Sequence, residues 1–358
     1  MKRTLLATLF VFAFAALAIS PNQVLAEKKV ILKIPSAFPI LNDVSLGEGP
    51  LFFKKGVEAA SNGSIIVKIY EPGKLVPPFQ IHEAVSSGKV NAGYTGPAYL
   101  AGKIPAAVFF STFPFGPPPE LFMGWFYRGN GMKLYQEMYD KAGYNFKGFP
   151  LTFMGPETSG WFKKPIKSPE DFKGLTVRFA GLAGKVMRKL GCSVSNIPGS
   201  EVFSSLEKGA IDGTEYGPPA VDRLLHFYKI VKYNYFPGWH QPSSMEELII
   251  NKKTWNSMSK TQQSIIELAA YAANTHTLAM TTTNQAKIVK KNAENYGVKN
   301  IKWSDEMLGL FYKTWLEVVK EESAKDPGFK KVWDDIQAFA AEQATWQSMG
   351  YLPRVMNK

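Results

Sequence analysis

Apolar and polar positions alternate in short, regular segments over the first part of the chain. Val30, Leu32 and Ile34 share one face before Pro35, which predicts a strand, and residues 46–63 have a helical period that ends at Asn-Gly. A second strand is predicted at 64–70, a helix at 79–87 and a third strand at 90–94. Short connections between strands in this order favour a parallel sheet with right-handed crossovers.

A second run of the same kind follows it. Residues 168–179 combine a capped helical turn with a strand, and helices and strands then alternate again. One segment is repeated between the two runs: "GKVNAGYTGP" at 88–97 and "GAIDGTEYGP" at 209–218 share the first glycine, a Val/Ile–Asn/Asp pair and the final Gly-Pro. The repeat predicts two α/β lobes of similar chain topology, the first at 27–150 and the second at 151–249.

The rest of the chain is predicted to be mainly helical. The apolar run Leu248–Ile250 indicates a buried strand that returns through the molecule, and helices are predicted over 260–296, 304–324 and 328–349. We assign residues from about 250 to 358 to the first lobe, which these helices complete. Their aromatic residues lie near helical spacing and indicate core packing.

The first 26 residues have the pattern of a secretory signal peptide. Two basic residues precede an apolar stretch from Leu5 to Ile19, and Val24 and Ala26 stand where signal peptidase requires small residues, which predicts cleavage after Ala26. The stretch is shorter than the ~20 residues that a membrane-spanning helix needs. We therefore expect an exported, periplasmic protein, with a retained membrane anchor as the alternative.

Composition narrows the classes of function. The chain has 45% hydrophobic residues, enough for two cores, and a formal net charge of +12. Its basic residues are scattered and form no nucleic-acid-binding motif, and the single cysteine, Cys192, excludes an intrachain disulfide. The sequence contains no motif of a P-loop enzyme, a dinucleotide-binding enzyme, a serine hydrolase or a zinc protease. Of the four histidines, only His240 in "PGWHQP" has an informative setting, and we interpret it as a hydrogen-bonding loop residue.

The repeated segments indicate where a ligand would bind. In open parallel sheets, ligands bind outside the carboxyl ends of the strands, and each repeat places a variable tripeptide there, at 93–95 and 214–216. The Gly-Pro that follows ends each strand, because proline has no N–H to donate to the sheet. Two such edges that face each other would form a cleft between the lobes. The alternative is that both are ordinary turns of a common type.

Arg178 is the candidate anchor for an anionic ligand. It stands near the end of the strand "LTVRF", before a glycine-containing loop and the amino end of a predicted helix. A guanidinium in this position can hold a carboxylate through two parallel hydrogen bonds. An ordinary surface arginine is the alternative.

Four longer segments resemble one family, the extracytoplasmic solute-binding proteins of tripartite ATP-independent periplasmic (TRAP) transporters. They are "VNAGYTGPAYLAGKIPAAVFF", "FKGLTVRFAGLAGKVMRKLG", "IPGSEVFSSLEKGAIDGTEYGPP" and "FPGWHQPSSMEELIINKKTW", and the likeness covers nearly all of the chain after the predicted signal. The resemblance implies a two-lobed α/β periplasmic-binding-protein fold with long C-terminal helices, and a cleft that closes on a small organic acid anion. It also implies membrane permease subunits as partners, and it places the family's carboxylate-binding arginine at Arg178.

Within that family, the chain is most similar to the branch that binds 2-oxo and 2-hydroxy monocarboxylates, in some members through a bridging metal ion. Two neighbouring carboxylates repel each other unless a cation neutralises them or one is protonated. Oxygen ligands fit a hard ion such as Ca²⁺ or Na⁺, and the alternative is a salt bridge between a glutamate and Arg178. Glu157 departs from the glutamine that is common at this position in the branch. The metal ligands implied by the resemblance are Glu157, Glu215, Tyr216 and Gln241.

We expect the ligand to be enclosed by charged, polar and aromatic side chains from both lobes, with no organic cofactor. The aromatic members should form the walls of the cleft, and the charged and amide members should hold the carboxylate. The predicted ligand-binding residues are Phe38, Tyr94, Tyr99, Glu157, Arg178, Tyr216, Trp239 and Gln241.

The function favoured by the sequence is capture of a small organic acid anion and its delivery to a membrane permease, without catalysis. One alternative is a receptor module that passes ligand occupancy to a sensor. A second is an enzyme that uses His240 and a glutamate as acid and base. No nucleic acid partner is expected, and a monomer is favoured over the dimers with exchanged C-terminal helices that occur in the resembling branch.

Overall fold

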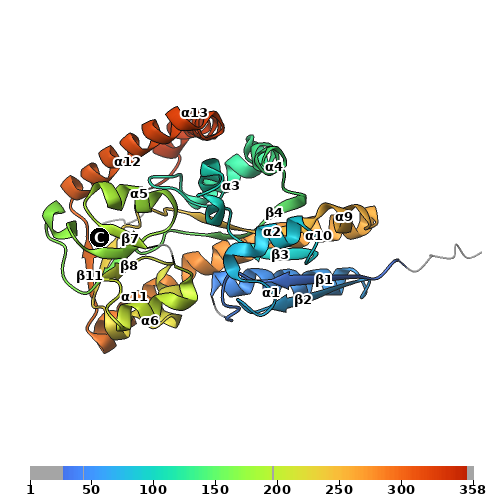
Figure 1. The fold of residues 1–358 in the computed structure, drawn as a ribbon, viewed down its shortest axis with the longest axis horizontal. Coiled ribbons are helices and arrows are strands. Elements are labelled where there is room, and N and C mark those ends of the chain that lie inside the picture. Colours follow the sequence, from blue (N-terminus) through green and yellow to red (C-terminus); the bar gives the residue numbers. More distant parts are fainter. Residues whose placement is uncertain (1–26, 43, 196, 353–358) are drawn as a thin grey trace, which may run out of the picture.

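The described strands form three β-sheets of two, three and six strands, in two groups that stand side by side with helices around each (Figure 1). The computed structural model describes residues 27–42, 44–195 and 197–352. The predicted signal peptide, residues 1–26, lies outside the described residues. We call the part of the molecule around β1–β4 and β10, whose two sheets adjoin at a bridge between Ser36 and Tyr94, the first lobe, and the part around the six-stranded sheet the second lobe.

The sheet of the first lobe begins as the sequence predicts. Strand β1 alternates buried and exposed side chains along most of its length and pairs in parallel with β2, and a parallel bridge from Ser36 to Tyr94 joins β1 to β3. Helix α1 packs against β2, β4 and the long helix α10, and α10 also packs against β4. The elements are β1 (Val30–Pro35), α1 (Ser45–Ala60), β2 (Ile65–Tyr70), α2 (Ile81–Ser86), β3 (Ala92–Thr95) and α10 (Lys260–Thr283).

Two long strands complete this sheet and connect it with the second lobe. Strand β10 (Ser244–Asn251) lies between β3 and β4 (Phe146–Met154) and is antiparallel to both. All eight of its residues are buried, which explains the continuous apolar run that predicted it. The sheet is therefore mixed where a mainly parallel sheet was expected, because the chain returns from the second lobe without a crossover helix.

The second lobe is built on a mixed six-stranded sheet. Its order is β11-β9-β5-β8-β6-β7, in which β5 is antiparallel to both neighbours and the other pairs are parallel. The strands are β5 (Gly160–Phe162), β6 (Thr176–Arg178), β7 (Ser193–Ser195), β8 (Gly213–Thr214), β9 (Tyr233–Phe236) and β11 (Lys299–Lys302).

The repeated segment forms the same sequence of elements in both lobes. In the first lobe α2 leads into β3, and Gly96-Pro97 then begins a 3₁₀ helix at 97–100. In the second lobe α6 (Gly199–Glu207) leads into β8, and Gly217-Pro218 precedes α7 (Pro219–Leu224). Proline begins the next helix in each case, Pro97 in the first lobe and Pro219 in the second, since its missing N–H is not needed at a helix start.

The C-terminal segment contributes to both lobes, which differs from the expectation that residues 250–358 complete the first lobe alone. Strand β11 pairs with β9 in the second sheet. Helix α12 (Asp305–Lys325) packs against α5 (Gly181–Lys189) of the second lobe, while α13 (Pro327–Met349) packs against α3 (Pro119–Arg128) and α4 (Gly131–Lys141) of the first (Figure 1). These helices therefore connect the lobes on one side of the molecule.

Helix ends follow recognisable capping signals. The predicted helix 260–296 is divided at Asn284 into α10 and α11 (Gln285–Tyr296), and Ser259 forms a capping box with Gln262 at the start of α10. Gly297 ends α11 in the left-handed conformation that glycine adopts most easily. Shorter helices are α7, α8 (Phe227–Ile230) and α9 (Lys252–Asn256), with 3₁₀ turns at Pro78–Gln80, Pro97–Leu100, Pro105–Phe110 and Pro169–Phe172.

Within residues 27–352, apart from the two undescribed positions, no helix has the length and apolar character required to cross a membrane. The long C-terminal helices are instead amphipathic, with Phe311 and Trp315 of α12 buried in the core as their helical spacing predicts.

Candidate functional site

A cavity between the lobes brings together residues that are far apart in the sequence. Arg178 ends β6, Tyr216 follows β8, and His240 and Gln241 lie in the loop that leads back into β10. The first lobe contributes residues that follow β1 and β3. Of the predicted ligand-binding residues, Phe38, Tyr99, Glu157, Arg178, Tyr216 and Gln241 line the cavity, and His240 and Glu246 line it as well.

Arg178 is held in this cavity by the register of the second sheet. Strand β6 pairs in parallel with β8 so that Arg178 lies opposite Thr214, and Glu215 is the next residue. Nη1 of Arg178 donates to a carboxylate oxygen of Glu215 at 2.6 Å and to its main-chain oxygen at 2.8 Å. The guanidinium carbon also lies 5.2 Å from the centre of the Tyr216 ring. Arg178 is thus a fixed, buried cation with Glu215 as its partner.

The salt bridge that the sequence left open as an alternative is therefore present. The Glu215 carboxylate accepts a second hydrogen bond from the main-chain N–H of Ala180, at 2.6 Å, just before α5 begins. Its other oxygen accepts from the side-chain amide of Gln241 at 3.0 Å. Burial raises the pKa of Glu215, but Arg178, the neighbouring His240 and the hydrogen bond from Ala180 outweigh burial and lower it to about 2. Glu215 is consequently ionised at neutral pH.

Glu157 lies close to Glu215, but its surroundings favour the neutral acid and not the ionised carboxylate. It is 4% exposed, and its Oε2 has no hydrogen-bond partner among the described residues. Burial, followed by the charges of Glu215 and Asp222, raises the pKa of Glu157 well above its usual range. Two glutamates in one cavity therefore differ in charge because only one of them faces Arg178.

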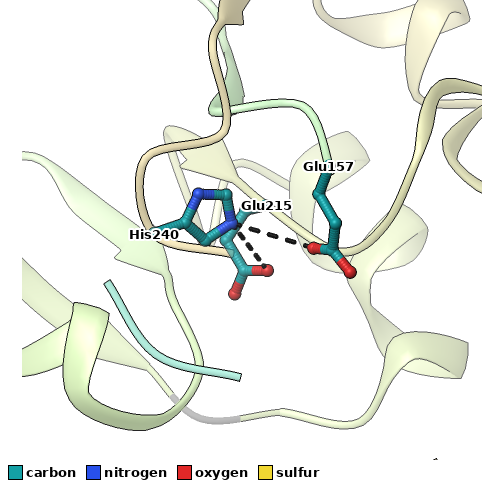
Figure 2. A group of neighbouring side chains, drawn as sticks. All are labelled: Glu157, Glu215 and His240. Carbon is teal, nitrogen blue, oxygen red and sulfur yellow. Dashed lines mark ion pairs between the residues drawn. The ribbon is translucent and has the colours of Figure 1, made fainter. Parts of the chain in front are cut away.

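His240 completes a cluster with these two carboxylates (Figure 2). Its Nε2 lies 3.6 Å from Glu215 and 3.8 Å from Glu157, and both side chains point toward the ring. One possible ligand atom of each residue lies within 4.8 Å of the other two. His240 lies in a loop as expected, and its ring faces the two carboxylates at ion-pair distance.

The donor set fits a metal ion. Glu157 Oε2 and both His240 nitrogens are buried without hydrogen-bond partners among the described residues, as unused ligand atoms would be. Gln241 presents its amide N–H to Glu215, and a half-turn of that amide would present its oxygen instead. Two carboxylates and an amide suit a hard cation, whereas a set dominated by histidine and cysteine would suit zinc.

Tyr216 also belongs to this wall, through its ring and hydroxyl. Its hydroxyl is buried and has no hydrogen-bond partner among the described residues, and its ring lies against Gly199 at the start of α6. A Cβ atom at position 199 would collide with that ring. The glycine therefore makes room for the aromatic wall.

Two predicted aromatic residues lie behind the cavity wall and do not form it. The Tyr94 hydroxyl hydrogen-bonds with Thr152 Oγ1 at 2.9 Å, and its ring packs edge-on against Phe38. Trp239 stacks on Phe311 of α12, with 4.5 Å between ring centres. Both side chains are buried and neither lines the cavity, so they support its walls from behind.

Glu246 is a charged lining residue that was not predicted from the sequence. It is the third residue of β10, it lies in the cavity, and its Oε2 has no hydrogen-bond partner among the described residues. The signal that could have revealed it is the pair of glutamates in "SSMEELIIN", directly before an apolar run that predicts complete burial.

Comparison with known proteins identifies the family to which the chain belongs. Residues 42–326 match the bacterial extracellular solute-binding proteins of family 7 (DctP). The chain is 34% identical over 302 residues to a monocarboxylate 2-oxoacid-binding periplasmic protein of Nostoc sp.. The aligned region covers 83% of this chain and 81% of that protein.

Solved structures agree with this relationship. A TRAP solute-binding protein from Bordetella bronchiseptica, with calcium and picolinate bound, superposes with a TM-score of 0.85 and 28% identity over 90% of this chain and 95% of that one. A second, from Pseudoalteromonas atlantica with sodium and pyruvate bound, has a TM-score of 0.85 and 30% identity over 90% and 97%. The chain belongs to the family 7 bacterial extracellular solute-binding proteins, the solute-binding component of TRAP transporters.

Proposed function

We propose that this protein captures a 2-oxo or 2-hydroxy monocarboxylate together with a hard cation, Ca²⁺ or Na⁺, and delivers the acid to a TRAP membrane permease. The observation that carries the proposal is the convergence of Glu157, Glu215 and His240 beside Arg178 in a buried cavity between the lobes. Glu157, Glu215, Gln241 and Tyr216 are the residues that would hold the cation.

Charge explains why a cation is needed. The positive charge of Arg178 is already balanced by Glu215 at 2.6 Å, so the pair offers little net attraction to an anion. Ionisation of Glu157 would make the cavity negative. A bound hard cation supplies the missing positive charge and accepts oxygen donors from the ligand. Arg178 would then hold the ligand carboxylate from the other side.

The relatives support the chemical class of the ligand. Pyruvate and picolinate, bound in the two solved relatives, each carry a carboxylate next to a second donor atom, a keto oxygen or a ring nitrogen. Such a pair of donors can chelate one ion, whereas acetate offers only its carboxylate. A carboxylate with a neighbouring oxygen is therefore the favoured ligand.

Calorimetry tests this proposal directly. Pyruvate should bind in buffer that contains Ca²⁺, bind weakly after exhaustive chelation in sodium-free buffer, and bind again when Ca²⁺ or Na⁺ is restored. Acetate should bind poorly in every condition. Full pyruvate affinity in chelated, sodium-free buffer would overturn the cation and leave Arg178 as the charge anchor.

We propose in addition that the ligand leaves unchanged and that the protein acts as a monomer in the periplasm after cleavage near Ala26. Support for binding without catalysis comes from the family, whose members are solute-binding proteins. Proton NMR of pyruvate incubated with the protein should show no product. Formation of a product would instead favour the alternative in which His240 and a glutamate act as acid and base.

A further inference from the structure

Glu246 and Glu247 are consecutive buried glutamates in β10, and among the described residues hydrogen-bond partners are found for the side chain of Glu247. Glu247 accepts hydrogen bonds from Tyr139 at 2.7 Å and from Tyr135, and it lies 2.7 Å from His82 Nε2. Consecutive side chains of a strand point to opposite faces of its sheet, so the two carboxyl groups enter different surroundings.

Glu246 faces the ligand cavity. The residue is only 8% exposed, and its Oε2 has no hydrogen-bond partner among the described residues. A buried carboxyl oxygen without a partner is unusual in a folded protein, because burial removes the water that would otherwise satisfy it. Glu246 lines the cavity, so a ligand bound there could supply the partner.

Gly96 makes the space for this carboxyl group. A Cβ atom at position 96 would collide with Glu246 Oε2. The backbone of Gly96 has a φ of −120°, which any residue adopts, so the conformation does not require glycine here. The requirement comes from the carboxyl group, and Gly96 belongs to the Gly-Pro that is repeated in both lobes.

The carboxyl lies on the opposite wall from the anchor of the ligand. Glu246 comes from the sheet of the first lobe, near Phe38, whereas Arg178 and Glu215 come from the sheet of the second. Burial, and next the neighbouring Glu247, raise the pKa of Glu246 well above its usual range, which favours the neutral acid. A neutral carboxyl can donate and accept hydrogen bonds without repelling an anion.

We propose that Glu246 determines specificity by hydrogen-bonding a hydroxyl group on the chain of the ligand, at the end away from Arg178. This inference rests on the proposed function. The preferred ligand is then a 2-oxo or 2-hydroxy monocarboxylate that carries a further hydroxyl at C3, since an unsubstituted methyl group leaves Glu246 Oε2 without a partner. A site that hydrogen-bonds a substrate hydroxyl discriminates strongly against the analogue that lacks it.

Calorimetry with two ligands that differ by one hydroxyl, pyruvate and 3-hydroxypyruvate, tests this in Ca²⁺-containing buffer. The wild-type protein should bind 3-hydroxypyruvate about tenfold or more tightly. Glu246→Leu should lose this preference through weaker binding of 3-hydroxypyruvate alone, and Glu246→Gln, which keeps a donor and an acceptor, should retain most of it. Gly96→Ala should also reduce the preference by displacing the carboxyl, and Gly102→Ala, whose added Cβ meets no atom within 4 Å, is the matched control.

The possible results distinguish a failure of this inference from a failure of the proposed function. Equal wild-type affinity for the two acids would overturn the role of Glu246 and leave the proposed function intact. The same would follow if Glu246→Leu weakened both acids by one factor, as a purely structural residue would. Failure of both acids to bind would reject the proposed function and this inference together. Thermal unfolding of each variant shows whether it is folded, and the glutamine and alanine variants suffice if the leucine variant is not.

Discussion

At the scale of single residues, this site is defined by how one cation is shared among carboxylates. Arg178 is 3% exposed and is bound to Glu215, which is therefore ionised, while Glu157 lacks such a partner and favours its neutral form. The same residue type thus takes two protonation states within one cavity. The difference depends on a contact and not on burial, because both glutamates are buried.

Replacement of Arg178 should affect binding and stability separately. Arg178→Lys keeps the charge but loses the planar pair of donors, so affinity for pyruvate should fall about tenfold or more. Arg178→Ala should in addition destabilise the protein by about 3–5 kcal/mol, because it leaves Glu215 as an unpaired buried charge. Calorimetry and urea unfolding measure the two effects, with the exposed Arg188→Lys as control. Unchanged affinity in Arg178→Lys would argue against paired contacts to the ligand.

Glu215 should make stability depend on pH in the acid range. Its pKa falls from an ordinary 4.5 to about 2 in the folded protein, so its stabilisation is complete above about pH 4.5 and is lost as the pH falls toward 2. The full effect is on the order of 3 kcal/mol. Urea unfolding at pH 3 and pH 6 should therefore show a larger deficit for Glu215→Gln at pH 6. Glu207→Gln, at an exposed position of α6, should show none.

At the scale of elements, the repeated helix–strand–proline unit places the two walls of the cavity. Gly96 and Gly199 lie at the start or end of these units, and each lies against a side chain of the site, Glu246 or Tyr216. The lobes use the same local construction for different contacts. Space left by a missing Cβ is in both cases what lets the wall residue take its position.

Gly199→Ala tests the second of these contacts. The added Cβ would meet the Tyr216 ring, which lies against Arg178, and cannot be accommodated without movement of the ring. Overpacking of this kind costs about 1–3 kcal/mol, and affinity for pyruvate should fall with it. Urea unfolding and calorimetry check both, against Gly102→Ala, where a Cβ meets no atom within 4 Å. A variant as stable as the control would show that the ring moves freely.

At the scale of the whole molecule, the lobes are joined by crossing strands and by the last two helices. Strands β4 and β10 belong to the first sheet and lead to or from the second lobe, and α12 and α13 pack on different lobes. The cavity lies where the crossing segments meet, since Glu157 follows β4 and His240, Gln241 and Glu246 lie before or within β10. Movement of the lobes would therefore act directly on the site.

The oligomeric state is a prediction at this scale. We expect a monomer, because the buried residues of α13, among them Phe329 and Ile336, pack within the same chain. The end of the helix is less covered: Trp346 is 63% and Met349 79% exposed. Light scattering at high protein concentration should give the monomer mass. A dimer mass, lost on Trp346→Ser, would show that this exposed end is an interface.

Much of the fold could be predicted from local sequence. Periodicity identified the first strands, the long C-terminal helices and the buried run of β10, because each signal lies within a few neighbouring residues. Parallel and antiparallel pairing could not be predicted in the same way. It depends on which distant strand lies alongside, as the insertion of β10 between β3 and β4 and of β11 beside β9 shows.

The candidate site could likewise be predicted from the sequence only in part. The sequence by itself determined that Arg178 ends a strand before a helix, and that Glu157, Glu215 and Gln241 offer oxygen ligands. Only the tertiary structure decided that Glu215 pairs with Arg178, that Trp239 packs on Phe311, and that His240 and Glu246 face the cavity. Side-chain direction and charge state arise from packing between distant segments, and local sequence does not contain those contacts.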